Sequence, residues 1–500
     1  MDINFILDGI TQFFHPVILI TAFLGTTLGI IIGALPGATA TMALTLMLPI
    51  SFNLDTYTAI TLLLAVYCGG IFGGSIPAIL LKIPGTPASA ATIFDGYPMA
   101  KKGKVSEALL FIVYSSSIGG FISGVILMIA APLLALLALN FGPPEMLALS
   151  LFGLSIVASL AAGNMLKGLL MGTLGLFVAT IGLDPQFGAP RFTFGNMNVY
   201  QGIPLIPVLI GVFSIPEAIT LMLNSHVSKK VQTIKKRFLL KWIEISNVLP
   251  TIFKSGMIGS ILGITPAVGP EVATFIGYNE AKRVSKHKEK FGTGIPEGIV
   301  ASESANNAVT GSSLVPTLTL GIPGSAAAAV IMGGLIIQGV RPGPSLFNND
   351  PKLISFIFVV FLLLQIVMFI VGIIVVNVSK YVIKVPSFYL GASIIVLSTV
   401  GSFAINNNLF GVFVMFFSGL IAYILGKFGF SPVPFILALI LGPQIEGEMN
   451  RTLLITGGEG FLNFFSFLFT RPIAILFFIL AVLTFFIPII RERRKQKNQL

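Results

Sequence analysis

The sequence predicts an all-α polytopic membrane protein whose helices form two related halves. Three observations support this fold class. The chain is 55% hydrophobic and only 10% charged, apolar runs recur almost to its end, and a Pro-Gly motif recurs in both halves. A soluble protein carries about 25% charged residues, so most of this surface must face lipid. A spanning helix needs about 20 apolar residues, so we expect about 10–14 transmembrane or half-membrane helices.

The apolar runs divide the chain into repeated parts. We predict a first transmembrane repeat at 1–223, a basic cytoplasmic linker at 224–247, a second repeat at 248–446, and a final helix with a basic tail at 447–500. The expected spans are 12–34, 57–82, 107–139, 144–162, 164–182, 203–223, 248–265, 299–322, 325–340, 353–379, 386–404, 409–427, 432–445 and 471–490. Some of these are expected to be hairpin arms or half-helices, because 53 glycines and 30 prolines interrupt them. Such residues are tolerated in membrane helices where neighbouring helices or cavity water satisfy the freed backbone groups.

The repeat is visible in three pairs of motifs. Gly-Ala-Leu-Pro-Gly at 33–37 corresponds to Gly-Ile-Thr-Pro-Ala at 263–267. Pro77 and the following Lys-Ile-Pro-Gly at 82–85 correspond to Pro316 and Gly-Ile-Pro-Gly at 321–324. A weaker pair is Ile-Pro-Glu217 and Pro-Gln-Ile-Glu446. Three matches in the same order favour an internal duplication.

Loop charge predicts that the two repeats are inverted in the membrane. Lysines and arginines cluster at 101–104, 229–241, 282–290 and 491–497, and short loops rich in these residues stay in the cytoplasm. The basic loop at 280–290 corresponds to 50–56, which has no Lys or Arg, and the basic loop at 101–104 corresponds to the weakly basic 339–352. Equivalent loops are therefore expected on opposite faces, with the C-terminus in the cytoplasm. We read the net charge of +11 as a topology signal beside anionic lipid rather than as a nucleic-acid surface.

The paired Pro-Gly motifs are the predicted substrate site. Proline removes a backbone donor and stops a helix, and the orphan backbone groups then need a partner that lipid cannot supply. A helix N-terminus suits a carboxylate, and secondary transporters place substrate and coupling ions at such interruptions. The alternative is a plain kink or a surface loop. The predicted substrate-binding residues are Pro36, Gly37, Thr39, Lys82, Pro84, Gly85, Thr86, Asn306, Asn307, Pro323, Gly324 and Ser325.

Ionisable residues near the breaks are candidates for ion coupling, because such residues are costly inside a membrane. Glu271 and Glu303 are predicted to bind a cation or a proton; the alternative for each is a solvated helix end. Lys82 either holds a substrate carboxylate or extends to the membrane interface. Asn306 and Asn307 suit ligand binding because an amide donates and accepts without a charge. Asp95 is read as a turn or cap residue.

Several classes of function are disfavoured. The single cysteine, Cys68, excludes an internal disulfide and a cysteine-rich metal site, and the three histidines show no metal-ligand spacing. We find no Walker-type phosphate loop and no nucleophile with a neighbouring base. We therefore expect neither an enzyme nor a metal or cofactor other than a coupling ion. The N-terminus begins with acids rather than a basic region, so a cleaved signal peptide is not expected.

Taken in order, these motifs resemble the large membrane subunit of tripartite tricarboxylate transporters, the TctA family. The resemblance rests on Gly-Ala-Leu-Pro-Gly-Ala-Thr-Ala-Thr (33–41), Ile-Pro-Gly-Thr-Pro-Ala-Ser-Ala-Ala-Thr (83–92), Arg-Phe-Thr-Phe-Gly (191–195), Glu-Ser-Ala-Asn-Asn-Ala (303–308) and Gly-Ile-Pro-Gly-Ser (321–325). It covers nearly the whole chain. Two departures stand out: the family usually has Asn where this chain has Lys82, and Pro-Gly where it has Pro266-Ala267, with the unusual Glu271 nearby.

The resemblance implies uptake of small, tricarboxylate-like carboxylates by ion-gradient-driven symport across the bacterial cytoplasmic (inner) membrane. It also implies a small membrane subunit and an extracytoplasmic solute-binding protein as partners. The resemblance and the broken helices together favour an alternating-access mechanism. The competing interpretations are a passive anion channel and a membrane scaffold without ion coupling. The expected coupling ion is Na⁺ or H⁺.

Overall fold

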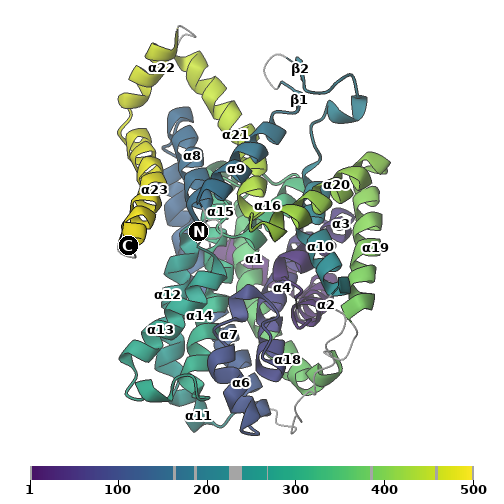
Figure 1. Ribbon diagram of the computed structural model, residues 1–500, viewed down its shortest axis with the longest axis vertical. Coiled ribbons are helices and arrows are strands. Elements are labelled where there is room, and N and C mark those ends of the chain that lie inside the picture. The colour runs from purple at the N-terminus through teal and green to yellow at the C-terminus, as the bar shows by residue number, and fades with distance from the viewer. Residues whose placement is uncertain are drawn as a thin grey trace. The chain divides into compact units, whose positions relative to one another are not determined.

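The computed structural model describes residues 3–35, 37–160, 165–184, 188–223, 239–266, 268–382, 387–456 and 460–497 (Figure 1). Nearly all of this chain is helical, and the only strands within it are β1 (Gly182–Leu183) and β2 (Pro190–Arg191), which pair antiparallel. Seven helices in the described part are long and apolar enough to cross a membrane, and shorter apolar helices accompany them. The prediction of an all-α polytopic membrane protein is confirmed.

The chain forms two compact units, and each takes segments from both halves of the sequence. Unit 1 comprises residues 1–135 and 213–405. Its first part contains α1 (Ile3–Phe13), α2 (Pro16–Gly33), α3 (Ala40–Phe52), α4 (Thr56–Gly73), α5 (Ser75–Leu81), η1 (Pro87–Ser89), α6 (Ile93–Lys101) and most of α7 (Val105–Ala138). Its second part contains the end of α10 (Leu205–Leu223), then α11 (Trp242–Ser246), α12 (Leu249–Ile264), α13 (Gly269–Val284), η3 (Lys288–Lys290), α14 (Pro296–Ser312), α15 (Leu314–Leu320), α16 (Ala326–Ile337), α17 (Pro344–Asn349), α18 (Pro351–Val382) and α19 (Ser387–Asn406).

The element order in unit 1 repeats. The series α2, α3, α4 and α5 recurs as α12, α13, α14 and α15. In each series the first helix crosses the third at close range. A Cβ atom on Gly29 would lie 2.5 Å from the carbonyl oxygen of Val66, and one on Gly259 would lie 2.3 Å from that of Ala305. The two crossings therefore use the same device, a glycine that lets two helix backbones touch.

The segments after the breaks are exchanged between the two series. The segment after α5, made of η1 and α6, packs against α13 and α14 of the second series. The segment after α15, which is α16, packs against α3 and α4 of the first series. This reciprocal packing relates the two series by a local two-fold exchange.

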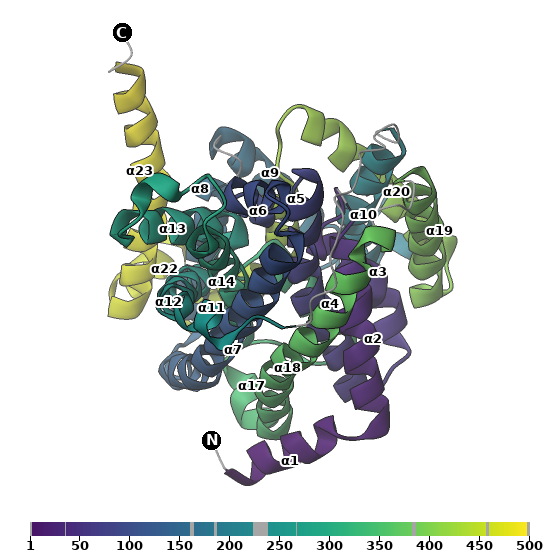
Figure 2. The same cartoon turned by 90° about the horizontal axis from the view of Figure 1, so that it is seen from below.

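Two helices form the centre of unit 1. All of α4 from Thr58 to Gly73 is buried, and so is α14 from Gly298 to Ser312. The long helix α18 packs against α1, α2 and α4, and these four helices lie together in the second view (Figure 2). Because α14 is buried yet rich in Ser, Asn, Thr and Glu, its polar side chains must find partners inside the protein.

Unit 2 comprises residues 136–212 and 406–500. It contains α8 (Pro143–Leu160), α9 (Met165–Ala179), the two strands, η2 (Met197–Val199), the start of α10, α20 (Leu409–Lys427), α21 (Val433–Ile455), α22 (Gly460–Phe469) and α23 (Pro472–Lys497). Helix α8 packs against α9, α21 and α23. The strand segment is tied to α21 through Arg191, whose guanidinium donates to both carboxylate oxygens of Glu446 at 2.5 and 3.1 Å.

The predicted repeats are continuous stretches of sequence, whereas each compact unit combines segments from both halves of the chain. The repeat boundaries therefore stay a prediction. Most of the basic linker, residues 224–238, lies outside the described residues. The basic residues Arg491, Arg493, Arg494, Lys495 and Lys497 fall on the last turns of α23.

Candidate functional site

Each series contains a helix that stops at a left-handed residue. In the first, α4 runs through Gly74 into the short α5, which ends at Lys82 with φ 59° and ψ 30°. In the second, α14 runs through Ser313 into α15, which ends at Gly321 with φ 68° and ψ 20°. The N–H of the left-handed residue donates to the carbonyl of Pro77 or Pro316 respectively. The two predicted breaks therefore have the same backbone geometry.

The Pro-Gly pairs let the chain turn back onto its own helix. A Cβ on Gly85 would lie 2.8 Å from the carbonyl oxygen of Gly74, and one on Gly324 would lie 2.6 Å from that of Ser313. The Gly85 N–H donates to the same Gly74 oxygen at 2.9 Å. Glycine is needed here because any larger residue would collide with the backbone.

A carboxylate from the second series is held by the first series. Glu303 of α14 is fully buried. Its Oε1 accepts hydrogen bonds from Ser75 Oγ, at 2.6 Å, and from Thr92 Oγ1. Its Oε2 accepts one from Ser116 Oγ of α7 at 3.2 Å. Ser75 and Thr92 flank the first break, so Glu303 reaches across from one series to the break of the other.

No basic side chain in the described part of the chain forms an ion pair with Glu303. Burying an unpaired carboxylate is costly, and a protein normally neutralises it with a proton or a cation. Three hydroxyl donors orient the carboxylate without neutralising it. This arrangement suits a group that exchanges a proton or a monovalent cation.

Two asparagines lie one turn further along α14. The amide of Asn307 donates to Ser116 Oγ at 2.8 Å and to the Glu303 carbonyl at 3.2 Å. Its Oδ1, and both polar atoms of Asn306, are buried without a hydrogen-bond partner among the described residues. Buried polar groups are nearly always paired, so these orphan atoms point to a ligand.

Tyr67 closes the second break. Its ring lies fully buried in α4, and its hydroxyl is 3.3 Å from Ser313 Oγ and 3.4 Å from Ser325 Oγ. Ser325 in turn caps α16 by accepting the Ala328 N–H at 3.1 Å. Glu303, Asn306, Asn307, Tyr67 and the hydroxyls of both breaks define what we call the α4–α14 polar cluster.

Comparison with known proteins identifies the group to which this architecture belongs. The family model described as Tripartite tricarboxylate transporter TctA family matches residues 19–437. The chain belongs to the TctA family. An uncharacterised 52.8 kDa protein of Agrobacterium vitis, from the TAR-I ttuC' 3' region, is 36% identical over 462 residues, covering 92% of this chain and 90% of that protein. A second Agrobacterium vitis protein, from the TAR-II ttuC' 3' region, is 33% identical over 241 residues, covering 48% of this chain and 98% of that protein.

TctA-family membership confirms the predicted resemblance and makes this chain a multi-pass membrane component of a transport system. The family is a transporter family rather than an enzyme family, and its description as tripartite implies further subunits and a binding protein.

The structure brings together only part of the predicted TctA-family site. Glu303, Asn306 and Asn307 lie in the α4–α14 polar cluster, and Thr86, Gly85, Pro323, Gly324 and Ser325 line the two breaks. Thr39 caps α3 by accepting the Met42 N–H at 3.1 Å, and Gly37 is exposed with φ 87°. Pro84 is half-buried, and Pro36 lies outside the described residues.

The other two charged candidates have exposed side chains. Lys82 is exposed, with its Nζ 5.8 Å from the centroid of the Tyr97 ring. Glu271, in the first turn of α13, is also exposed. Neither contacts Glu303 in the hydrogen bonds of the described chain, so the cluster has a carboxylate but no lysine.

Sequence reasoning missed Tyr67, Ser75 and Ser116. Ser75 and Ser116 gave no signal, because single serines are common in membrane helices. Tyr67 could have been found by extending the repeat alignment backwards, because it stands as far before Lys82 as Asn306 stands before Gly321.

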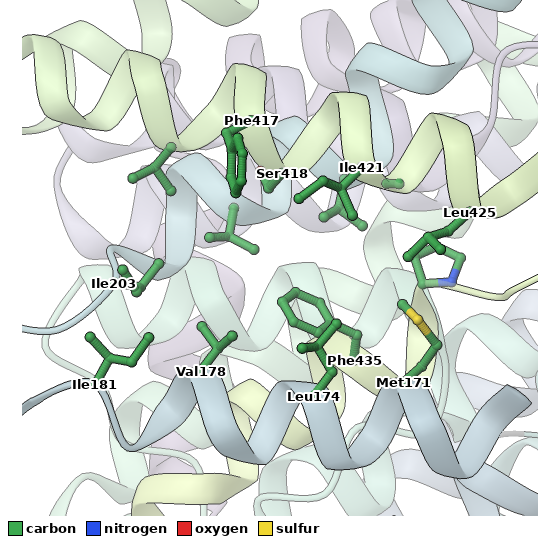
Figure 3. A pocket seen from close by; sticks show the side chains of 15 residues that line it. Met171, Leu174, Val178, Ile181, Ile203, Phe417, Ser418, Ile421, Leu425 and Phe435 are labelled. Carbon is green, nitrogen blue, oxygen red and sulfur yellow. The ribbon is translucent and has the colours of Figure 1, made fainter. Parts of the chain in front are cut away.

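Unit 2 holds a separate cavity of about 280 Å³. Figure 3 shows that Met171, Leu174 and Val178 of α9 face Phe417 and Ile421 of α20 across it. Its lining is aliphatic and aromatic except for Ser418, whose hydroxyl donates to the Met415 carbonyl at 3.1 Å. A carboxylate would lose its hydration there and gain no donor, so this cavity does not suit the substrate of a tricarboxylate transporter.

Proposed function

We propose that this chain is the large transmembrane subunit of a tripartite, ion-gradient-driven secondary transporter that imports small carboxylates of the tricarboxylate type. The observation that carries the proposal is Glu303, a buried carboxylate beside a broken helix of the opposite series, whose hydrogen bonds within the described residues all come from hydroxyls. Family membership supplies the substrate class, and Glu303 supplies a physical means of coupling to an ion.

Charge neutralisation is the proposed coupling step. An ionised Glu303 repels a carboxylate substrate, and inside a protein this repulsion is stronger than in water. A proton or Na⁺ bound at Glu303 removes the repulsion. Ion and substrate then favour each other's binding, and the linkage is reciprocal.

Alternating access is the proposed transport step. The segments after the breaks are exchanged, since η1 and α6 pack on α13 and α14 while α16 packs on α3 and α4. A rigid-body movement of one series against the other therefore changes both breaks at once. In inverted-repeat transporters such a movement exposes the central site to one face and then to the other.

The remaining parts of the proposal concern place and partners. Loop charge favours inverted repeats with the C-terminus in the cytoplasm, and family membership favours the bacterial inner membrane. A solute-binding protein delivers the substrate on the outer face, and a small membrane subunit completes the complex.

The test is uptake by the complete tripartite system in proteoliposomes. Radiolabelled citrate, malate and succinate are supplied under a Na⁺ gradient alone, an H⁺ gradient alone, or neither. We expect concentrative uptake of at least one carboxylate that depends on one gradient and on the binding protein. Equal uptake after both gradients collapse would favour a passive anion channel, and no uptake at all would favour a scaffold.

A further inference from the structure

Tyr67 and Asn306 occupy equivalent positions in the two series. Each stands the same number of residues before its left-handed stop, Lys82 or Gly321. The residues just before them confirm this register, because Val66 and Ala305 make the equivalent close contacts with Gly29 and Gly259. The two positions nevertheless carry side chains of very different length.

The longer side chain reaches the break of the opposite series. Tyr67, on α4, places its hydroxyl beside Ser313 and Ser325, which flank the second break. The residues of the first break that correspond to these serines are Gly74 and Thr86. The two-fold exchange therefore directs Asn306 toward Gly74 and Thr86. The contact of 2.6 Å between Ser75 and Glu303, one turn before Asn306, shows that α14 lies against this part of the first break.

The asparagine side chain is too short to reach the break of the opposite series, as the tyrosine does. A phenol ring spans the distance to the opposite break, whereas an amide ends close to its own helix. Both polar atoms of Asn306 are accordingly buried without a partner among the described residues, while the Tyr67 hydroxyl has two. Polar atoms left in this state are costly unless a ligand pairs with them.

We infer that the two breaks are not equivalent sites: Asn306 and the first break bind a carboxylate group of the transported substrate, and Tyr67 closes the second break. The inference rests on the proposed function. In this arrangement the Asn306 amide donates from Nδ2 to a carboxylate oxygen, and the hydroxyl of Thr86 at the first break is a second donor. Because Glu303 lies one turn before Asn306 and contacts Ser75 and Thr92 at the first break, the substrate binds there once Glu303 has been neutralised.

The test compares uptake kinetics of three variants in the complete reconstituted system, with radiolabelled citrate, malate and succinate. Asn306→Ala removes the amide and Asn306→Tyr fills the space with the residue of the other series. The matched control is Gln365→Leu on α18, which also removes a buried amide with an unpartnered oxygen, but one whose Nε2 donates to Cys68 Sγ at 3.3 Å and to the Phe361 carbonyl at 3.1 Å.

We expect Asn306→Ala to raise the substrate KM by about tenfold or more, since a hydrogen bond to a charged group is lost. The ion concentration for half-maximal uptake is expected to stay within about twofold, on the view that Asn306 binds substrate rather than the ion. Asn306→Tyr should abolish uptake while the protein elutes as the wild type does in gel filtration. Gln365→Leu should keep the wild-type KM.

If the wild-type protein is active, three results would overturn this inference but leave the proposed function standing. They are an unchanged KM in Asn306→Ala, normal uptake by Asn306→Tyr, and a change confined to the ion dependence, which would make Asn306 an ion ligand. An inactive wild type overturns the proposed function and the inference with it. Asn306→Ala keeps the test decisive if the larger tyrosine prevents folding.

Discussion

Lys82 and Gly321 end equivalent helices in the same left-handed conformation, with φ of 59° and 68°. The agreement shows that the fold, rather than the residue type, imposes this backbone geometry. Glycine adopts it at little cost, whereas a lysine there is strained by roughly 1–2 kcal/mol. The first break therefore carries strain that the second does not.

Replacing Lys82 by glycine should relieve that strain. We expect Lys82→Gly to stabilise the protein by about 1 kcal/mol and Gly321→Ala to destabilise it by a similar amount. The check is the thermal unfolding temperature of the purified protein in one detergent. Lys82→Ala, which removes the amine but keeps the strain, is the control; an equal gain from Lys82→Ala would assign the effect to charge.

The close helix crossings should not tolerate a residue larger than glycine. Gly259→Ala places a Cβ 2.3 Å from the carbonyl oxygen of Ala305. The helices α12 and α14 must then separate, and such overpacking typically costs about 1–3 kcal/mol. Gly426 on α20 has open space around it, so Gly426→Ala should be neutral or stabilising through helix propensity. Equal unfolding temperatures for the two variants would refute the close-packing argument.

Asp95 should be a structural residue rather than a ligand. Its Oδ1 accepts the backbone N–H groups of Gly292, Gly294 and Ile295 at 3.0, 2.7 and 2.9 Å, and its Oδ2 accepts the Tyr278 hydroxyl at 2.8 Å. Asp95→Ala should destabilise the protein by about 3 kcal/mol, since the charged acceptor of several buried donors is lost. Tyr278→Phe, which removes one of these bonds, should cost less. A larger fall in unfolding temperature for Tyr278→Phe would contradict this assignment.

Glu303→Gln should uncouple transport from the ion gradient. The amide keeps the shape of the side chain but carries no charge to neutralise, so substrate binding no longer requires the ion. We expect gradient-driven accumulation to be lost, while exchange of labelled for unlabelled substrate persists, and the effect of the ion on substrate affinity, usually about 5–150-fold between coupled ligands, to disappear. Glu271→Gln is the informative comparison. If Glu271→Gln uncouples and Glu303→Gln does not, the coupling residue is Glu271.

The sequence predicted the breaks well because they depend on local chemistry. Proline and glycine restrict the backbone wherever they stand, so Pro84-Gly85 and Pro323-Gly324 could be recognised without a structure. The lengths of the apolar runs were less informative about which helices form. The expected spans omitted α3 and α13, because α3 has only 13 residues and α13 carries several charged side chains.

Side-chain partners could not be predicted because they depend on the exchanged packing. Its place in an apolar run makes Lys82 either a substrate ligand or a side chain that extends to the membrane interface, and the left-handed turn leaves it exposed. Thr92 approaches Glu303 because the segment after the first break packs on α14, and Ser75 approaches it because α4, which leads into α5, packs on α14 as well. Nothing in the local sequence of either segment specifies that contact.

The orientation of the repeats decides how the two breaks face the membrane. A two-fold exchange arises from an axis in the membrane plane, which inverts the series, or from an axis along the membrane normal, which keeps them parallel. Loop charge favours inversion.

Asn53 and His287 are both exposed, and they lie in equivalent loops of opposite charge character. Single cysteines at these positions should react with a membrane-impermeant maleimide from opposite faces, with position 287 labelled only after the cytoplasmic side is opened. The native Cys68 is buried, so the otherwise unchanged protein serves as the unlabelled control. Labelling of both positions from one face would make the repeats parallel. Both breaks would then open toward the same side of the membrane, and a rocking movement of one series against the other would no longer exchange access between the two faces.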